Sequence, residues 1–241
     1  MARSARVCGP GGLLLAILAL SSCGGKAIHL GTPRDGGGTP LDGGCAQAQT
    51  SANEMLWIGD SWILVPGVQY TRVRDLAIGA QAIGPNDDFP ISATGGATMA
   101  DIAIQYSARQ AGATKVKVLI MDGGTWDTIK ANGAAATVTS VVSTFSQLLS
   151  TVANDGTARH IIYFLPPEIA TIPGVAALRA PLQQACAQSA VPCHFIDLKD
   201  SWNGHPEYFV TSAGIPIPTD AGGTAIAEAI WSVMQQNCIA Q

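Results

Sequence analysis

The sequence predicts an α/β fold, in which a mostly parallel sheet is covered by helices on both faces. Short apolar runs, typical of buried strands, alternate along residues 45–241 with longer segments of helical periodicity. Strands that alternate with helices favour crossover connections, and these build parallel sheets. The composition agrees, because 47% of the residues are hydrophobic and 12% are charged. About 197 residues of this kind fit one domain.

Five short runs predict the strands, and they lie at 55–59, 76–83, 115–121, 160–165 and 194–198. The first run ends in the turn Gly-Asp-Ser at 59–61, and the third ends in Asp-Gly-Gly at 122–124. The fourth stops at Pro166 and Pro167, which cannot continue a central strand. The second is only weakly strand-like. Each of the other runs is apolar throughout most of its length, as a strand buried on both faces requires.

Four segments with helical periodicity lie between and after these runs, at 98–110, 138–153, 174–189 and 221–236. Thr98 is the expected N-cap of the first helix, with Asp101 three positions further on as in a capping box. The segment 138–153 is amphipathic, and 221–236 is the closing helix. Each therefore has an apolar face to lay against the sheet.

The N-terminus has the features of an export signal. Arg3 and Arg6 precede an apolar stretch at 13–20, which is too short to cross a bilayer as a stop-transfer helix. Leu-Ser-Ser-Cys at 20–23 then matches a bacterial lipobox. We expect a signal peptide at 1–22 and lipidation of Cys23; the alternative is ordinary secretion with Cys23 as a spare thiol. No other stretch is apolar for long enough to form a transmembrane helix.

Residues 23–44 are rich in glycine and proline, so we expect a flexible tether between the lipidated cysteine and a domain at 45–241. The chain carries 13 basic and 17 acidic residues, a net charge of −4. Removal of Arg3 and Arg6 with the signal peptide leaves 11 basic and 17 acidic residues, a net charge of −6. No basic patch occurs, which argues against binding to nucleic acid.

Four cysteines remain in the predicted domain: Cys45, Cys186, Cys193 and Cys238. An even number in an oxidising compartment predicts disulfides. We expect Cys186–Cys193 as a local bridge and Cys45–Cys238 as a clip between the start of the domain and its last helix, although four cysteines allow three connectivities. A zinc site is the alternative, but no Cys-x-x-Cys spacing supports it.

Ligands of parallel α/β sheets bind at the carboxyl ends of the strands. The residues to consider are therefore those that follow each predicted strand, at 59–61, 122–127, 166–168 and 199–207. A serine on the sharp turn after a buried strand exposes its hydroxyl at such an edge. Ser61 is in this position.

Two segments resemble the first two motifs of the SGNH (GDSL-type) hydrolases. They are Met-Leu-Trp-Ile-Gly-Asp-Ser at 55–61 and Thr-Gly-Gly-Ala-Thr-Met-Ala-Asp at 94–101. The resemblance implies a three-layer αβα sandwich around a mostly parallel, five-stranded, flavodoxin-like sheet. It also implies Ser61 as the nucleophile of an esterase and the Gly96 amide as part of the oxyanion hole, where a backbone N–H stabilises developing charge. A plain loop-to-helix turn is the alternative for Gly96.

The third motif of the family departs from its Gly-x-Asn-Asp pattern. Gly124 and Asp127 are kept, but Trp126 stands where asparagine is expected, and a shift of one residue would place Thr125 there. An indole N–H can donate one hydrogen bond, but its bulk would fill the cleft. Loss of an oxyanion donor costs about 10²–10³ in rate.

The last motif, Asp-x-x-His before a Pro-x-x-Ala-Gly helix start, departs further. Pro-Thr-Asp-Ala-Gly at 218–222 matches the helix start. The aspartate position falls on Ala213 or Gly214 and the histidine position on Pro216 or Ile217, so no imidazole is present in either register. A serine without a positioned base is a poor nucleophile, and loss of a triad member removes most of the rate.

One histidine could substitute, because His205 follows the last predicted strand on the correct edge of the sheet, with Glu207 or Asp200 to orient it. A solvent-facing loop histidine is the alternative. Asp60, Asp122 and Asp127 could form a carboxylate cluster for a metal, although aspartates in such turns more often bind local backbone amides, and we predict no metal site. Trp62, Trp126 and Trp202 could line a cleft for a sugar or acyl chain, or pack in the core.

Two functions follow from these residues. The first is an envelope esterase that acts through Ser61 on O-acyl groups of glycans or lipids. The second is a non-catalytic SGNH-type lipoprotein that binds a glycan, lipid or protein in the old cleft, with Asp60, Trp62, Trp126 and Asp127 as the candidate binding residues. Either would be a monomer without a cofactor, exported and held to the envelope membrane by its lipid anchor alone.

Overall fold

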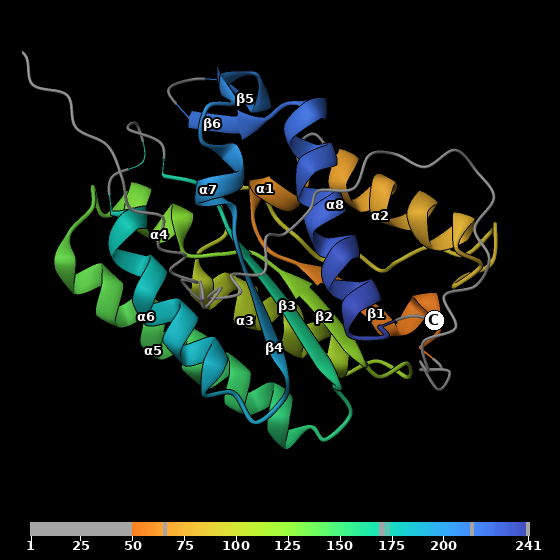
Figure 1. The fold of residues 1–241 in the computed structure, drawn as a ribbon. Helices are drawn as coiled ribbons and strands as arrows, with labels where there is room; N and C mark the ends of the chain where they lie inside the picture. Colours follow the sequence, from red (N-terminus) through yellow and green to blue (C-terminus); the bar gives the residue numbers. More distant parts are fainter. Residues whose placement is uncertain (1–49, 65–66, 169–171, 173, 213–214, 240–241) are drawn as a thin grey trace, which may run out of the picture. The chain divides into compact units, whose positions relative to one another are not determined.

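Residues Gly44–Gln241 form one compact unit. The computed structural model describes residues 50–239 except 65–66, 169–171, 173 and 213–214. The predicted signal peptide, Cys23, the tether and Cys45 lie outside the described residues. The predicted α/β architecture is confirmed, with helices on both faces of a parallel sheet (Figure 1).

The main sheet has four parallel strands in the order β1-β2-β3-β4. They are β1 (Met55–Ile58), β2 (Val118–Met121), β3 (His160–Leu165) and β4 (Cys193–Asp197). Every residue of β1 and β2 is buried, because helices cover both faces, and this is why these runs lack the alternation of a half-exposed strand. Since all four strands are parallel, their carboxyl ends meet at one edge, and the candidate residues follow them there.

Helices α2 (Val68–Gly79) and α8 (Asp220–Gln236) pack against each other on one face of the sheet. On the other face lie α3 (Met99–Gln110), α5 (Ala135–Asn154) and α6 (Val175–Ala187) (Figure 1). The capping box predicted at Thr98 and Asp101 is present at the start of α3. Shorter elements complete the unit: the 3-10 helices η1 (Ala52–Glu54) and η2 (Pro206–Tyr208), and the helices α1 (Ser61–Leu64), α4 (Thr125–Lys130) and α7 (Leu198–Trp202).

The strand predicted at 76–83 is wrong, because α2 occupies the first half of this segment and turns and bends form the rest. The face that α2 buries consists of Gln69, Val73 and Ala77, so it is narrow and partly polar. The helical periodicity of α2 is therefore weak. The apolar residues near its end led to the prediction of a strand instead. The edge position beside β1 is taken instead by an isolated parallel bridge between Trp57 and Ile91. The regular sheet thus has four strands among the described residues, where the resemblance implied five.

A second, two-stranded antiparallel sheet joins β5 (Phe209–Ser212) to β6 (Ile215–Pro218). The sequence did not predict this hairpin. It carries the segment where the family's catalytic histidine is expected, and β6 packs against α1, which begins at Ser61. The hairpin therefore brings the altered last motif to the serine.

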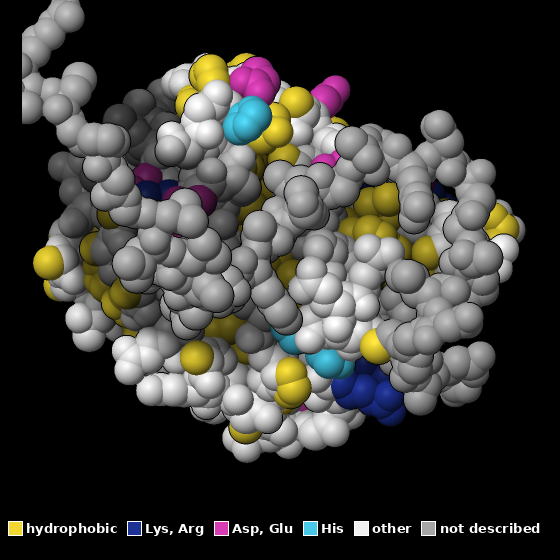
Figure 2. All heavy atoms as spheres, in the orientation of Figure 1, with side chains coloured by type: hydrophobic (Ala, Val, Ile, Leu, Met, Phe, Trp, Pro, Cys, Tyr) yellow, Lys and Arg dark blue, Asp and Glu magenta, His cyan; other side chains and the backbone are white. Residues whose placement is uncertain are grey.

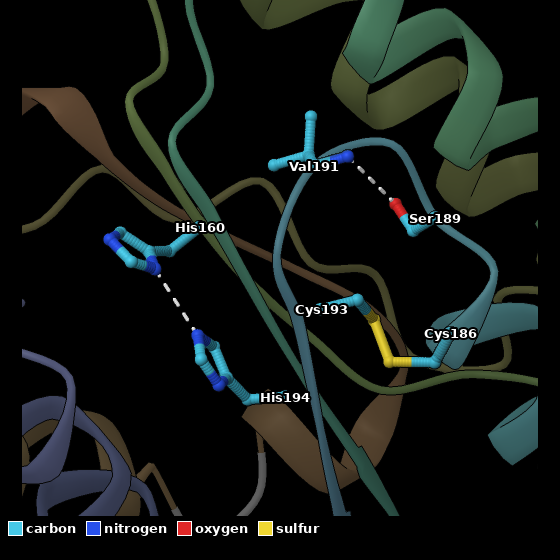
Figure 3. The surroundings of a disulfide bond; sticks show 6 residues. All are labelled: His160, Cys186, Ser189, Val191, Cys193 and His194. Carbon is cyan, nitrogen blue, oxygen red and sulfur yellow. Dashed lines mark hydrogen bonds between the residues drawn. A yellow bond between two sulfur atoms is a disulfide. The ribbon is translucent and has the colours of Figure 1, made fainter.

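The bridge expected between Cys186 and Cys193 is present, with the two Cα atoms 5.3 Å apart, and it ties α6 to the start of β4 (Figure 3). Cys238 is also disulfide-bonded, and its expected partner, Cys45, lies outside the described residues. Within the described ranges, no helix combines the length and apolar character needed to cross a membrane.

Candidate active site

Ser61 lies where the sequence placed it, at the first residue of α1 and directly after the turn that ends β1. The turn depends on Gly59, whose φ is +150°. A Cβ atom at this position would lie 1.7 Å from Asp122 Oδ1 and 2.8 Å from Ile63 Cδ1. Glycine is therefore required here both by its backbone conformation and by the close approach of Asp122.

Two buried side chains hold this turn in place. The Gly59 N–H donates to Gln105 Oε1 at 2.8 Å, and Gln105 Nε2 donates back to the Gly59 carbonyl at 3.1 Å. The Asp60 N–H donates to Asp122 Oδ1 at 2.8 Å. Helix α3 and the residue after β2 thus fix the backbone on which Ser61 stands. Sequence reasoning missed Gln105, although a polar residue near Ile102 and Tyr106 on the buried face of α3 was the available signal.

The Ser61 hydroxyl accepts a hydrogen bond from the indole of Trp126, with 2.9 Å between Nε1 and Oγ. Both residues are half-buried. Thr125, the other residue proposed for the asparagine position, is buried, and its hydroxyl has no hydrogen-bond partner among the described residues. Trp126 rather than Thr125 therefore faces the serine, and its bulky ring occupies the space beside the hydroxyl.

Gly96 lies in the turn before α3, with a φ of +79°. It lines a cavity of about 380 Å³ together with neighbouring residues of the turn and of α3, including Thr94, Asp101 and Gln105. Its carbonyl accepts a hydrogen bond from Lys130 Nζ at 2.9 Å. Ser61 is not among the residues that line this cavity. The glycine turn is therefore kept, but its role as an oxyanion donor stays a prediction.

The position of the expected catalytic histidine is occupied by apolar side chains. On β6, Pro216 is buried and Ile217 is half-buried, and this strand packs against α1. Neither side chain can accept a proton. The structure thus brings the last motif to the serine without the imidazole that would activate it.

His205, the predicted substitute base, is engaged elsewhere. Its Nδ1 lies 2.7 Å from Glu207 Oε1, which agrees with Glu207 as the orienting carboxylate. Its ring stacks on Tyr208, with centroids 4.5 Å apart and planes 9° apart. The hydrogen bond from His205 lowers the pKa of Glu207. No hydrogen bond joins His205 to Ser61 in the described part of the chain.

His205 lines a cavity of about 400 Å³ with Glu168, Lys199, Asp200 and Trp202, beyond the carboxyl ends of β3 and β4. Lys199 and Glu168 form an ion pair across it, with 3.0 Å between Nζ and Oε2. Histidine and acidic side chains lie at the surface in the region of β5 and β6 (Figure 2). This cavity lies on the expected edge of the sheet, but Ser61 is not among the residues that line it.

Asp60 and Asp122 form a buried pair beneath the serine. Both are fully buried, and their side chains hydrogen-bond to one another. Burial raises the pKa of Asp60 to about 6, and burial together with the charge of Asp60 raises the pKa of Asp122. Among the described residues, neither Oδ2 atom has an N–H or O–H donor, so a proton held by one carboxyl supplies the missing donor. The pair therefore holds the turn from beneath, and Asp60 also hydrogen-bonds the Ser61 side chain.

The remaining candidates also bind within the protein. Asp127 Oδ2 accepts from the Met99 N–H at 2.8 Å, so it caps α3, and burial raises its pKa. Trp62 is 1% exposed and packs on Trp202, with ring centroids 5.6 Å apart. Core packing, the alternative interpretation, therefore describes Trp62, whereas Trp202 packs in the core and also lines the cavity beside His205. Of the predicted binding residues, Trp126 and Asp60 contact the serine hydroxyl with their side chains.

No group of three or more histidine, cysteine, aspartate or glutamate side chains able to hold a metal ion occurs within the described ranges. The three predicted carboxylates instead bind backbone amides: Asp60 accepts from the Trp62 N–H, Asp122 from the Asp60 N–H and Asp127 from the Met99 N–H. This is the local role that aspartates at such turns usually have.

No protein-family model matches the chain, and no curated protein matches its sequence. Several solved structures share the fold. An acetyl xylan esterase matches with a TM-score of 0.61 and 12% identity, over 74% of this chain and 98% of its own. A lipolytic protein of the G-D-S-L family from Veillonella parvula matches with a TM-score of 0.56 and 17% identity, over 76% of this chain and 98% of its own. A psychrotrophic esterase from Pseudoalteromonas sp. matches with a TM-score of 0.58 and 11% identity, over 77% of this chain and 99% of its own. The chain therefore has an SGNH/GDSL hydrolase-like fold.

Proposed function

We propose that this protein binds an acylated ligand at the Ser61 edge of an SGNH-type domain without the base needed to hydrolyse it efficiently. One observation carries this proposal. The Ser61 hydroxyl accepts a hydrogen bond from Trp126, while the strand that should supply an imidazole offers Pro216 and Ile217. Asp60 also hydrogen-bonds the Ser61 side chain, but its carboxyl is paired with Asp122 and accepts from the Trp62 N–H. Without an imidazole base, the serine hydroxyl stays a weak nucleophile at neutral pH.

The ligand class follows from the fold and from the cavities at this edge. An acetyl xylan esterase is among the similar structures, and glycans that carry O-acyl groups are the ligands we propose. Both cavities beside the strand ends combine apolar surface with hydrogen-bonding groups, as sites for sugars and acyl groups do. Lipids that carry an ester are the second ligand class.

Esterase activity is the second candidate function, and one observation favours it. The strand, the glycine turn and Ser61 itself are all in place, and Gln105 and Asp122 hold this turn rigidly. A protein that only binds its ligand has no evident need for a serine at this position.

A fluorophosphonate probe distinguishes the two functions, because it reacts with activated serines. We expect no labelling at Ser61 of the full-length chain and no p-nitrophenyl acetate hydrolysis above that of Ser61→Ala. We also expect saturable binding of acetylated xylo-oligosaccharides by calorimetry, with deacetylated oligosaccharides as the control. Labelling at Ser61 together with turnover that Ser61→Ala abolishes would instead establish the esterase.

We also propose that the protein is exported and anchored to the envelope by a lipid on Cys23. The lipobox directly behind the apolar segment 13–20 supports this. Metabolic labelling with a palmitate analogue should mark the wild-type chain and not Cys23→Ser. Labelling of both chains, or of neither, would contradict the anchor.

A further inference from the structure

His160 and His194 form a pair at the end of the sheet opposite to Ser61. His160 begins β3, and His194 is the second residue of β4. Ile162 is the register partner of His194, and His160 lies on the same face as Ile162 because side chains alternate along a strand. The two imidazoles therefore share one face of the sheet, and neither is used by the proposed function.

The two rings meet end to end. His160 Nδ1 lies 3.2 Å from His194 Nε2, the ring centroids are 5.4 Å apart and the planes differ by 25° (Figure 3). At most one proton fits between the facing nitrogens, so at least one of them presents a lone pair to the other. Two neutral imidazoles can also present both lone pairs, with their protons on the outer nitrogens.

We propose that His160 and His194 bind a borderline divalent transition-metal ion, with Zn²⁺ as the probe, in place of the shared proton. Imidazole nitrogen bonds Zn²⁺ at about 2.0–2.1 Å. Two such bonds at angles of about 90–110° place the nitrogens about 2.9–3.4 Å apart, and the observed separation of 3.2 Å lies within this range. Water completes the coordination, since both residues are only half-buried.

Small movements are sufficient for this exchange. The ion lies off the line between the nitrogens, so both rings must turn toward it. This turn uses the torsion about the Cβ–Cγ bond of histidine, which has a broad energy minimum. The backbone does not need to move, because β3 and β4 are paired in register.

The surroundings anchor the strand that carries His194 and disfavour protonation of both rings. Cys193 points to the opposite face from His194 and is bonded to Cys186 of α6 (Figure 3), so this disulfide anchors the strand that carries His194. Burial lowers the pKa of both histidines, and the charges of His194 and Arg159 lower that of His160 further. Metal ions bind the neutral form of imidazole. The positive charge of Arg159 opposes a cation, so affinity depends on the two nitrogen bonds.

Calorimetric titration of the tag-free, full-length chain with Zn²⁺ tests this site. We expect one saturable Zn²⁺ per chain, at least a tenfold weaker affinity in His160→Gln and in His194→Gln, and no change in His205→Gln, the matched control. Circular dichroism shows whether each variant is folded. Absence of saturable binding, or equal affinity in all four proteins, would overturn the site and leave a hydrogen-bonded pair only.

A second measurement uses the wild-type chain alone and does not depend on the folding of variants. Zn²⁺ should protect His160 and His194, but not His205, from modification by diethylpyrocarbonate, as read by peptide mass spectrometry. Equal modification of all three with and without Zn²⁺ would contradict the proposal.

Discussion

The buried pair of Asp60 and Asp122 should make the protein less stable as the pH rises from 4.5 to 7. Burial raises the folded-state pKa of Asp60 from the ordinary value of 3.8 to about 6. Between these two values the folded chain binds more protons than the unfolded chain, so the free energy of unfolding falls as the pH increases. The stabilisation is fully present below the unfolded pKa and is lost as the pH passes through the folded pKa.

The size of this effect follows from the same two values. A difference from 3.8 to about 6 corresponds to a loss of about 3 kcal/mol in the free energy of unfolding over the whole titration, and about 2 kcal/mol of this loss falls between pH 4.5 and 7. Asp122, whose pKa is also raised, continues the decline at higher pH. Urea unfolding followed by tryptophan fluorescence measures this quantity at each pH, because Trp57, Trp62 and Trp202 are buried and report the loss of the core.

Asp122→Asn is the variant that tests the cause. The asparagine Oδ1 can still accept from the Asp60 N–H, and its amide donates to the Asp60 carboxylate without a titrating proton. We expect the variant to unfold with a flatter pH dependence between 4.5 and 7 and to exceed the wild type in stability at pH 7. The same slope in both proteins would refute the shared proton.

Three further changes test the turn and the altered motif. Gln105→Leu leaves the buried Gly59 N–H without its acceptor, while the Gly59 carbonyl still accepts from the Thr94 N–H at 3.0 Å. We expect urea unfolding to show a loss of about 1–3 kcal/mol in the free energy of unfolding. The control Gln184→Leu, at an exposed position, should change it by no more than about 0.5 kcal/mol. Gly59→Ala should lower the free energy of unfolding by about 3 kcal/mol or more, because its Cβ would lie 1.7 Å from Asp122 Oδ1. The control Gly156→Ala, with φ +68° and no neighbour within 4 Å, should lower it by only about 1–2 kcal/mol. Equal shifts of the melting temperature in both variants would show that the close approach of Asp122 is unimportant. Introducing Gly214→Asp with Ile217→His restores the residue types of the family motif, and position 217 lies on β6, which packs against α1. The double variant should raise p-nitrophenyl acetate hydrolysis about tenfold or more, but not when Ser61→Ala is added; no gain would mean that this motif cannot present a base to Ser61.

The local patterns of the sequence determined most of the fold. Continuous apolar runs such as those of β2 and β3 predict strands buried on both faces, and the capping box at Thr98 and Asp101 fixes where α3 begins. These features depend on interactions between residues that are near in the chain or on one burial pattern, so they can be recognised in sequence alone. Helix α2 was missed for the same reason, because its buried face contains Gln69 and only two apolar residues.

The sequence also determined that Ser61 follows a strand and that the last motif has no histidine. The tertiary structure alone decided what the serine contacts, because Trp126 is 65 residues away in the chain and its hydrogen bond to Ser61 depends on how α4 packs. It likewise decided that Gln105 holds the turn, that Asp60 and Asp122 are buried together, and that His160 meets His194 across two strands. Such contacts depend on the register and packing of elements far apart in sequence, which no local pattern of residues encodes.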